Sequence, residues 1–194
     1  MQHYLFSADT ALLTPRCVIR RFREGDGRAF YQLLDANRDY LSEHFPHLLD
    51  DSGPGASPEE AEAFVRQRLA YWHLQLDYAF AVWDAEGDDL VGYLHFTDID
   101  WAIPRAELAF FIDRDQAQQG IMSEAVARAV RYAFHQLRLE KLIMLTLSDN
   151  YPSQRLARKV GFTREGDLRN EFRRPGGALA DLVRFGLTRE AYGE

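Results

Sequence analysis

The chain has 194 residues, 46% of them hydrophobic and 27% charged, which is typical of a single globular domain. Its net charge of -7 disfavours binding to a nucleic-acid backbone, which requires clustered Lys and Arg. No apolar run reaches the length of a membrane span, the N-terminus lacks a secretory pattern, and one cysteine permits no internal disulfide. We therefore expect a cytoplasmic protein, one domain over residues 1–194, with no membrane or nucleic-acid partner.

Hydrophobic periodicity divides the first half of the chain into a strand, three helices and a strand hairpin. The third helix has the clearest start, because Ser57 can cap it, Pro58 suits its first position and Glu60 completes a capping box. Cys17 falls in an alternating segment, which favours a small buried hydrophobe over a nucleophile. In chain order, the predicted elements are a strand at Arg16–Phe22, helices at Asp26–Ala36, Asp39–Phe45 and Ser57 to about Leu76, and strands at Tyr78–Trp83 and Leu90–Asp98 joined through Glu86-Gly87-Asp88.

The second half of the chain alternates strands and helices. One of its strands is a continuous apolar run, which predicts burial on both faces. The order of elements predicts an α/β fold with a mixed sheet, antiparallel early and with a crossover helix in the middle. The predicted elements are a strand at Ala106–Asp113, a helix from Met122 to Leu137, the apolar strand at Leu142–Leu147, a helix from Asn150 or Pro152 to Gly161, and extended segments from Phe162 to about Phe172 and at Leu179–Thr188.

The segment NYPSQRLARKVGF is the most constrained motif of the chain. Asn150 is a candidate N-cap, Ser153 falls in the first turn, and Gly161 can end the helix in the left-handed conformation. A helix that begins at the C-terminal end of a strand and presents Asn and Ser is well placed to meet a ligand.

A second candidate binding segment lies between the strand at Ala106–Asp113 and the helix that follows it. The first amides of a helix have no internal partners, and the helix dipole favours an anion such as a pyrophosphate there. Gly120 would let the backbone approach a ligand closely. The alternative is an ordinary helix start capped by local side chains, because a single glycine is weak evidence.

Together, these segments resemble the GNAT superfamily, and more closely its RimJ/RimL-like group of ribosomal-protein N-terminal acetyltransferases. The resemblance implies a single-domain GNAT fold, in which helices flank a mixed, mostly antiparallel central sheet splayed between two parallel strands. It also implies acetyl-CoA as donor and the N-terminal α-amine of a protein or peptide as acceptor. The resemblance rests on Ala106-Glu107-Leu108-Ala109-Phe110-Phe111-Ile112-Asp113, Gly120-Ile121-Met122-Ser123-Glu124-Ala125, Asn150-Tyr151-Pro152-Ser153, and Gly161-Phe162 followed by Glu165-Gly166.

The resemblance also implies which residues bind the cofactor. The backbone of Phe111, Ile112 and Asp113 would pair with pantetheine, and Asn150 would contact CoA unless it serves only as the helix cap. The pyrophosphate would lie on the amides of Gln118, Gln119, Gly120, Ile121, Met122 and Ser123.

The anion-binding loop departs from the family pattern. The family usually has Gln or Arg, Gly, any residue and Gly, whereas this chain has Ala117, Gln118, Gln119 and Gly120. Gln118 must adopt the conformation of the glycine that it replaces. If its φ is positive, we expect strain of about 1 kcal/mol or more and weaker or altered CoA binding.

The implied catalytic residues are Glu107 as general base and Ser153 as the acid that protonates the departing thiolate. Only a neutral amine attacks a thioester, and an α-amine with a pKa near ~7.8 is neutral more often than a lysine near ~10.4. A positioned base contributes about 10²–10⁴-fold. The alternatives are a solvated carboxylate and a capping hydroxyl, and Tyr151 is a second candidate acid.

The acceptor end is the least specified part of the sequence. The resemblance places Tyr40, His44 and Phe45 at the wall of an acceptor pocket, although a core or surface role is equally compatible with their pattern. His44 and His47 precede two aspartates, but the spacing does not favour a metal site, and we expect none.

Two other functions stay open from the sequence. The acceptor could be a small-molecule amine (polyamine, amino acid or aminoglycoside), or the chain could be a catalytically weak acyl-CoA-binding module. The sequence also permits a homodimer through the C-terminal strands.

Overall fold

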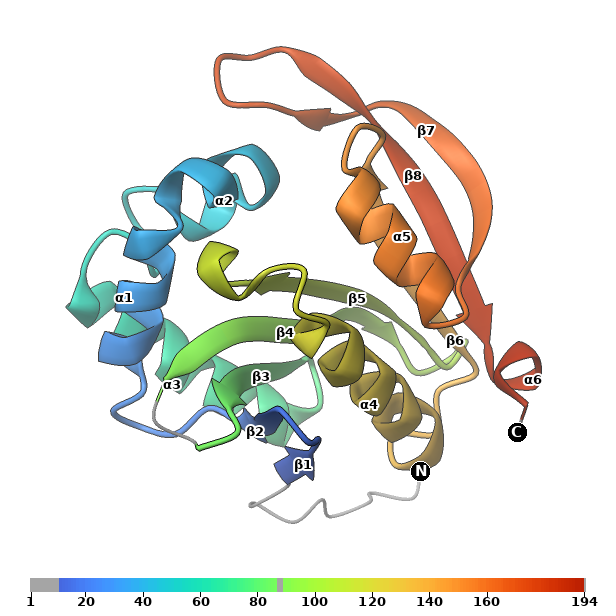
Figure 1. Cartoon of the computed structure of the whole chain (residues 1–194), viewed down its shortest axis with the longest axis horizontal. Helices are drawn as coiled ribbons and strands as arrows, with labels where there is room; N and C mark the ends of the chain where they lie inside the picture. The colour runs from blue at the N-terminus through green and yellow to red at the C-terminus, as the bar shows by residue number, and fades with distance from the viewer. Residues whose placement is uncertain (1–10, 87–88, 194) are drawn as a thin grey trace.

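The structure of the protein, a computed structural model, describes residues 11–86 and 89–193 (Figure 1). Its strands are β1 (Ala11–Leu13), β2 (Cys17–Arg21), β3 (Tyr78–Asp84), β4 (Leu90–Asp100), β5 (Arg105–Ile112), β6 (Lys141–Leu147), β7 (Thr163–Arg173) and β8 (Leu179–Thr188). Its helices are α1 (Gly27–Ala36), α2 (Arg38–His44), η1 (Pro46–Leu48), α3 (Pro58–Leu74), η2 (Arg114–Gln116), α4 (Ile121–His135), α5 (Tyr151–Lys159) and α6 (Arg189–Tyr192).

The strands form one eight-stranded sheet in the order β1-β2-β3-β4-β5-β6-β8-β7. Among the strands in residues 11–86 and 89–193, only β5 and β6 pair in parallel, so the predicted mixed and mostly antiparallel sheet is confirmed. The sequence did not reveal β1, η1, η2 or α6, because elements of three or four residues are too short for periodicity to mark them. Within the predicted turn between β3 and β4, Gly87 and Asp88 lie outside the described residues.

The sheet opens between its two parallel strands. The pairing of β5 with β6 covers three positions and ends at Glu107 opposite Ile143. Beyond that point β5 continues to Ile112 and β6 to Leu147 without pairing to each other. The splayed sheet is therefore confirmed, and the far half of β5 has an edge with no neighbouring strand.

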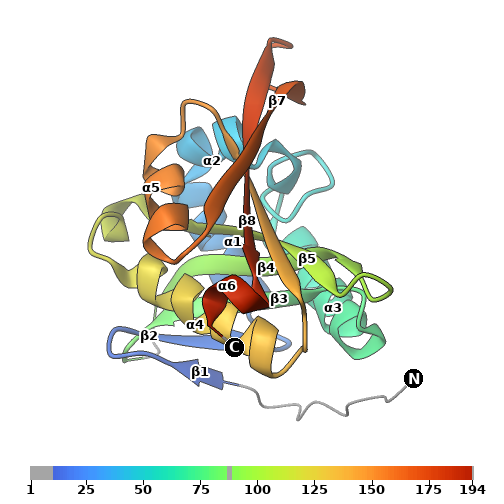
Figure 2. The ribbon, with the colours of Figure 1, turned by 90° about the vertical axis from the view of Figure 1, so that its right-hand side faces the viewer.

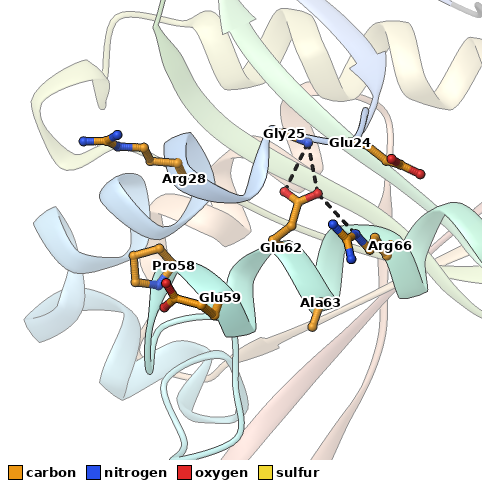
Figure 3. A pocket seen from close by; sticks show the side chains of 8 residues that line it. All are labelled: Glu24, Gly25, Arg28, Pro58, Glu59, Glu62, Ala63 and Arg66. Atoms are coloured by element: carbon orange, nitrogen blue, oxygen red, sulfur yellow. Dashed lines mark hydrogen bonds and ion pairs between the residues drawn. The ribbon is translucent and has the colours of Figure 1, made fainter.

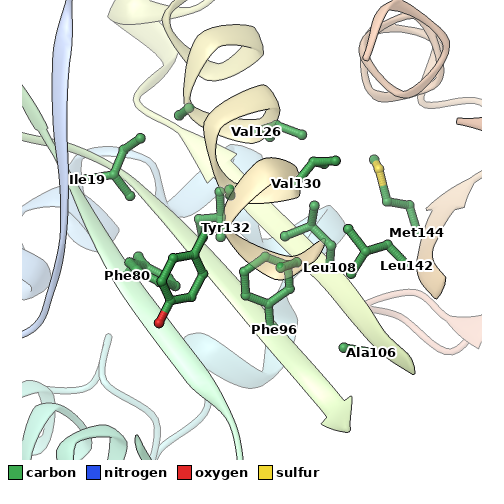
Figure 4. Close-up of a cluster of buried hydrophobic side chains, with 14 of the residues drawn as sticks. Ile19, Phe80, Phe96, Ala106, Leu108, Val126, Val130, Tyr132, Leu142 and Met144 are labelled. Carbon is green, nitrogen blue, oxygen red and sulfur yellow. The ribbon is translucent and has the colours of Figure 1, made fainter. Parts of the chain in front are cut away.

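Helices cover both faces of the sheet, each over its own apolar core (Figure 2). On one face, Val126 and Val130 of α4 pack over Phe80, Phe96 and Leu108 of the sheet (Figure 4). The helix α5 joins the same core. On the other face, α1, α2 and α3 cover a smaller core built mainly from aromatic rings: Phe22, Phe30, Tyr93 and Phe111.

The apolar strand β6 differs from its prediction. Its burial alternates, with Leu142 and Met144 buried and Ile143 and Leu145 only half-buried. The expectation of burial on both faces is wrong, because the side chains on the α4 and α5 side are packed in the core while those on the opposite side are only partly covered.

Local sequence signals account for the helix starts that matter here. The Ser57 hydroxyl accepts a hydrogen bond from the Glu60 amide at 3.1 Å, as the capping pattern predicts. Gly161 follows α5 with a φ of 99°, which confirms the left-handed stop. None of the helices in the described ranges is both long and apolar enough to span a bilayer.

Candidate functional site

The loop from β5 to α4 contains two left-handed residues close together. Gln118 has a φ of 63° and Gly120 a φ of 86°. Gly120 tolerates this conformation because it lacks a Cβ atom, whereas Gln118 adopts it at a cost of about 1–2 kcal/mol. Gln118 therefore has a positive φ, and the strain expected from the sequence is present.

The amides of this loop are free to bind a ligand. In the described part of the chain, no hydrogen-bond partner exists for the backbone N–H groups of the six residues from Gln118 to Ser123. Gly120 is the N-cap of α4 and contributes no side-chain cap, so the alternative of a side-chain-capped helix start is excluded. Consecutive unpaired amides at a helix start fit a phosphate group.

The pairing of β5 with β4 limits which of its backbone groups are available to pantetheine. The Asp113 amide donates to Val91 O at 2.7 Å, and its carbonyl accepts from the Gln116 amide at 3.0 Å, so neither group is available to a ligand. Because antiparallel pairing alternates, Phe111 also bonds towards β4, and its side chain lies in the core. The backbone groups that face the open edge belong to Phe110 and Ile112.

Glu107 stands at the last paired position before the sheet opens. Its neighbours Ala106 and Leu108 are buried under α4, so the Glu107 side chain points to the opposite face, towards α1 and α2. Burial raises the pKa of Glu107, and the carboxylate of Asp98 raises it further, while Arg184 opposes the shift. A half-buried carboxylate with a raised pKa suits proton transfer near neutral pH.

The start of α5 brings Asn150 and Ser153 beside the opening. Asn150 Oδ1 accepts a hydrogen bond from the Ser153 amide at 3.1 Å, so Asn150 is the N-cap. The half-buried Ser153 hydroxyl has no partner within the described residues, whereas Tyr151 is 63% exposed. Ser153 thus keeps a free donor on the first turn of the helix.

Of the three residues predicted to line the acceptor pocket, Tyr40 and His44 lie near the start of α5, whereas Phe45 packs against the core. The ring centroids of Tyr40 and His44 lie 4.9 Å apart. His44 Nδ1 is 3.5 Å from the side-chain nitrogen Nδ2 of Asn150, and this contact joins α2 to the start of α5. Burial lowers the pKa of His44, although the carboxylates of Asp149 and Glu43 oppose this. Phe45 instead packs on the core ring of Phe111 at 5.6 Å.

An ion-pair bridge that the sequence did not reveal spans the outer end of the opening. Arg174, from the turn between β7 and β8, pairs with Glu43 of α2 at 3.0 Å and with Asp149 before α5 at 2.5 Å. Beside it lies a hollow of about 400 Å³, lined by Ser42, Pro46, Leu49, Asp50, Arg173, Arg174 and Pro175. The two segments that meet here, residues 42–50 and 173–175, are distant in sequence, so no local pattern could have identified their contact.

A buried polar cluster lies on the same face as Glu107. The Arg68 guanidinium donates to Asp77 Oδ2 at 2.5 Å, and His95 Nε2 is 3.2 Å from the same oxygen, without the alignment of a hydrogen bond. His95 pairs with Ala109 in the sheet, two residues from Glu107. Neither Asp77 nor His95 stood out in the sequence, because isolated polar residues in apolar strands carry no spacing signal.

A larger hollow of about 620 Å³ lies elsewhere, between the start of α1 and α3 (Figure 3). Glu62 accepts hydrogen bonds there from the Gly25 and Gly27 amides and pairs with Arg66. The carboxylate thus serves as a cap for α1. This hollow shares no residue with the opening between β5 and β6. Over the described ranges, no group of three or more His, Cys, Asp or Glu could hold a metal, and His44 and His47 form no such group.

The chain is similar to known proteins in sequence and in fold. The profile of the acetyltransferase (GNAT) domain family matches residues 16–163. A probable N-acetyltransferase of Bacillus subtilis, YjcK, is 33% identical over 152 residues, which cover 78% of this chain and 82% of the relative.

Two solved structures share the fold. Ribosomal-protein-S5-alanine acetyltransferase from Vibrio fischeri superposes with a TM-score of 0.86 at 18% identity, covering 96% of this chain and all of the other. Spermidine N-acetyltransferase from Vibrio cholerae, in complex with CoA and spermine, has a TM-score of 0.77 at 24% identity, covering 93% of this chain and 100% of the other. The two structures share one fold and differ in the acceptors that their names give.

Proposed function

The chain belongs to the acetyltransferase (GNAT) family, and on this premise we propose that it transfers an acetyl group from acetyl-CoA to the N-terminal α-amine of a protein or peptide. The observation that carries the donor assignment is the row of unpaired amides from Gln118 to Ser123 beside the open edge of β5. A pyrophosphate fits those amides, and an extended pantetheine arm fits the backbone of Phe110 and Ile112.

The proposed chemistry divides between two side chains. Acetyl-CoA, when bound, supplies the acetyl thioester. Glu107 takes a proton from the acceptor ammonium, which makes the neutral amine available for attack. Attack by the amine forms the C–N bond, and collapse of the tetrahedral intermediate breaks the C–S bond. Ser153 gives its hydroxyl proton to the departing thiolate and regains a proton from the nitrogen that has attacked, which leaves the neutral amide and CoA. Asn150 holds the first turn of α5 so that this hydroxyl faces the opening.

The acceptor in this proposal enters between α2 and the β7–β8 turn, past Tyr40 and His44. Support comes from the charges at this entrance. Glu43 and Asp149 both pair with Arg174, which offsets part of the negative charge that the additional ammonium groups of a polyamine would meet there. Glu107 is the carboxylate that this proposal assigns to the reacting amine.

A panel of acceptors tests the acceptor assignment. Peptides with free N-termini, the same peptides with blocked N-termini and one lysine, spermidine, amino acids and an aminoglycoside would be incubated with acetyl-CoA. Mass spectrometry would locate the acetyl group. We expect transfer to free N-termini. Transfer to spermidine or another small amine, with none to peptides, would replace the proposed acceptor.

The change Glu107→Gln tests the base. We expect kcat to fall about 10²–10⁴-fold at pH 7, with the affinity for CoA retained. Activity of the unchanged enzyme should rise with pH through the raised pKa of Glu107, and this limb should vanish in the variant. Normal turnover by Glu107→Gln would remove the assignment, while CoA binding without turnover by the unchanged enzyme would favour a binding module.

A further inference from the structure

Arg16 reaches the anion-binding loop from the other end of the chain. It lies just before β2, yet its guanidinium donates to the carbonyl oxygen of Gln119 and to Glu124 Oε1, the latter at 2.7 Å from Nη2 and 3.0 Å from Nε. Glu124 belongs to the first turn of α4. A single side chain therefore ties the loop to the helix that begins at its end.

The bond to Gln119 fixes the direction of the next amide. In a planar trans peptide, the carbonyl of one residue and the N–H of the following residue point in opposite directions. Because Arg16 holds the Gln119 carbonyl, the Gly120 N–H must point away from Arg16. This N–H is one of the unpaired amides of the loop.

Gly120 leaves the space that the guanidinium occupies. A Cβ atom at this position would lie 2.7 Å from Arg16 Nη2, closer than such atoms approach. The positive φ of Gly120 is a second reason for glycine. Arg16 therefore packs against one side of the loop, and the unpaired amides lie on the other side.

Arg16 also offsets a carboxylate close to the free amides. Glu124 Oε1 pairs with Arg16, whereas Glu124 Oε2 is buried without a hydrogen-bond partner in the part of the chain described. The hydrogen bond from Arg16 lowers the pKa of Glu124, so the carboxylate is charged at neutral pH. Without Arg16, this charge would repel an anion at the start of α4.

We propose that Arg16 is a positioning residue for the donor's pyrophosphate: it orients the Gly120 amide through Gln119 and offsets the charge of Glu124 without touching the ligand. This inference rests on the proposed function, since it assumes that the loop binds CoA. The same contact braces the loop in which Gln118 has a positive φ.

Calorimetric titration with CoA and with 3′-dephospho-CoA, which keeps the pyrophosphate, tests this role. Arg16→Ala should weaken both ligands roughly tenfold. Arg16→Lys should also bind weakly, because one ammonium cannot hold Gln119 and Glu124 in the same fork. With any accepted amine, the variants should raise KM for acetyl-CoA and leave kcat nearly unchanged.

Arg38 supplies the matched control. Its side chain is 43% exposed, against 46% for Arg16, and it likewise joins a carboxylate, Asp35, to a backbone carbonyl, that of Gly55. Arg38→Ala should bind CoA normally, and the Tm of both alanine variants should show that they fold.

Three results would overturn the inference. Arg16→Ala could bind both ligands normally, or Arg16→Lys could match the unchanged protein, which would mean that charge alone suffices. A loss confined to CoA would mean that Arg16 contacts the 3′-phosphate directly. If the unchanged protein failed to bind millimolar CoA, the proposed function itself would be wrong. If the unchanged protein and all variants bound CoA equally well, only the role of Arg16 would be wrong.

Discussion

The starts of α3 and α4 show two opposite uses of a helix N-terminus. At α3, the Ser57 hydroxyl caps the Glu60 amide, Pro58 fills the first position and acidic residues follow. At α4, Gly120 offers no side chain, and the amides up to Ser123 have no partner in the described structure. The first arrangement stabilises the fold locally, whereas the second leaves groups unsatisfied that a ligand can satisfy.

The difference shows how the chain separates stability from binding. The capped start satisfies its amide through its own residues and needs no side chain from elsewhere in the fold for this. The open start depends on a residue about a hundred positions away, because Arg16 holds its loop. A binding loop with unsatisfied amides and a left-handed Gln118 requires such external support.

Among the expected effects on CoA affinity, the largest comes from a substitution of Gly120 at the start of α4. Gly120→Ala should weaken CoA binding about 10- to 100-fold, because the new Cβ displaces Arg16 and strains the loop. Calorimetry on the folded variant measures this loss. Gly161→Ala is the control, since Gly161 also has a positive φ but meets its nearest atom only at 3.8 Å. Equal CoA affinities in both variants would contradict the role given to Arg16.

Removing the cap of α3 should affect stability and leave binding intact. Ser57→Ala deletes the oxygen that the Glu60 amide uses, and we expect the free energy of unfolding to fall by about 1 kcal/mol. Urea denaturation measures this change. The CoA affinity of the variant should equal that of the unchanged protein, and a loss of affinity would mean that the two helix starts are coupled.

Relieving the backbone strain at Gln118 should increase the affinity of the loop before α4 for CoA. Gln118→Gly permits the positive φ without cost, and we expect CoA to bind up to about threefold more tightly because the loop is easier to hold. Gln75→Gly is the control, since Gln75 also has a positive φ but ends α3. Tighter CoA binding in both variants, or in neither, would show that the strain at Gln118 does not influence the site.

The smallest expected effect is a change in Tm that arises from the buried carboxylate of Glu107. Burial raises the pKa of Glu107 in the folded protein, so its ionisation destabilises the fold as pH rises through that pKa. Glu107→Gln should therefore raise Tm by roughly 1–3 °C at pH 7.5, and the gain should disappear in acid. Thermal unfolding against pH measures this.

The exposed residue Glu171 gives the control, because Glu171→Gln changes the same charge without altering a buried carboxylate. A lower Tm for Glu107→Gln than for the unchanged protein at pH 7.5 would contradict the claim that the ionised Glu107 destabilises the fold.

The sequence by itself determined the local structure of the molecule. The start of α3 at Ser57, the cap at Asn150, the stop at Gly161 and the strands of the sheet follow from patterns of neighbouring residues. These are contacts between residues close in the chain, so their chemistry can be read locally. The family pattern then supplied the expectation that the loop before α4 binds a phosphate.

The tertiary structure alone decided what surrounds that loop and which groups face the opening. Arg16 meets Gln119, Arg174 joins Glu43 to Asp149, and Asp77 meets His95 only because the fold brings distant segments together. No periodicity marks such partners in the sequence. The choice between Phe111 and Ile112 as a backbone contact likewise depends on strand register, which pairing with β4 sets.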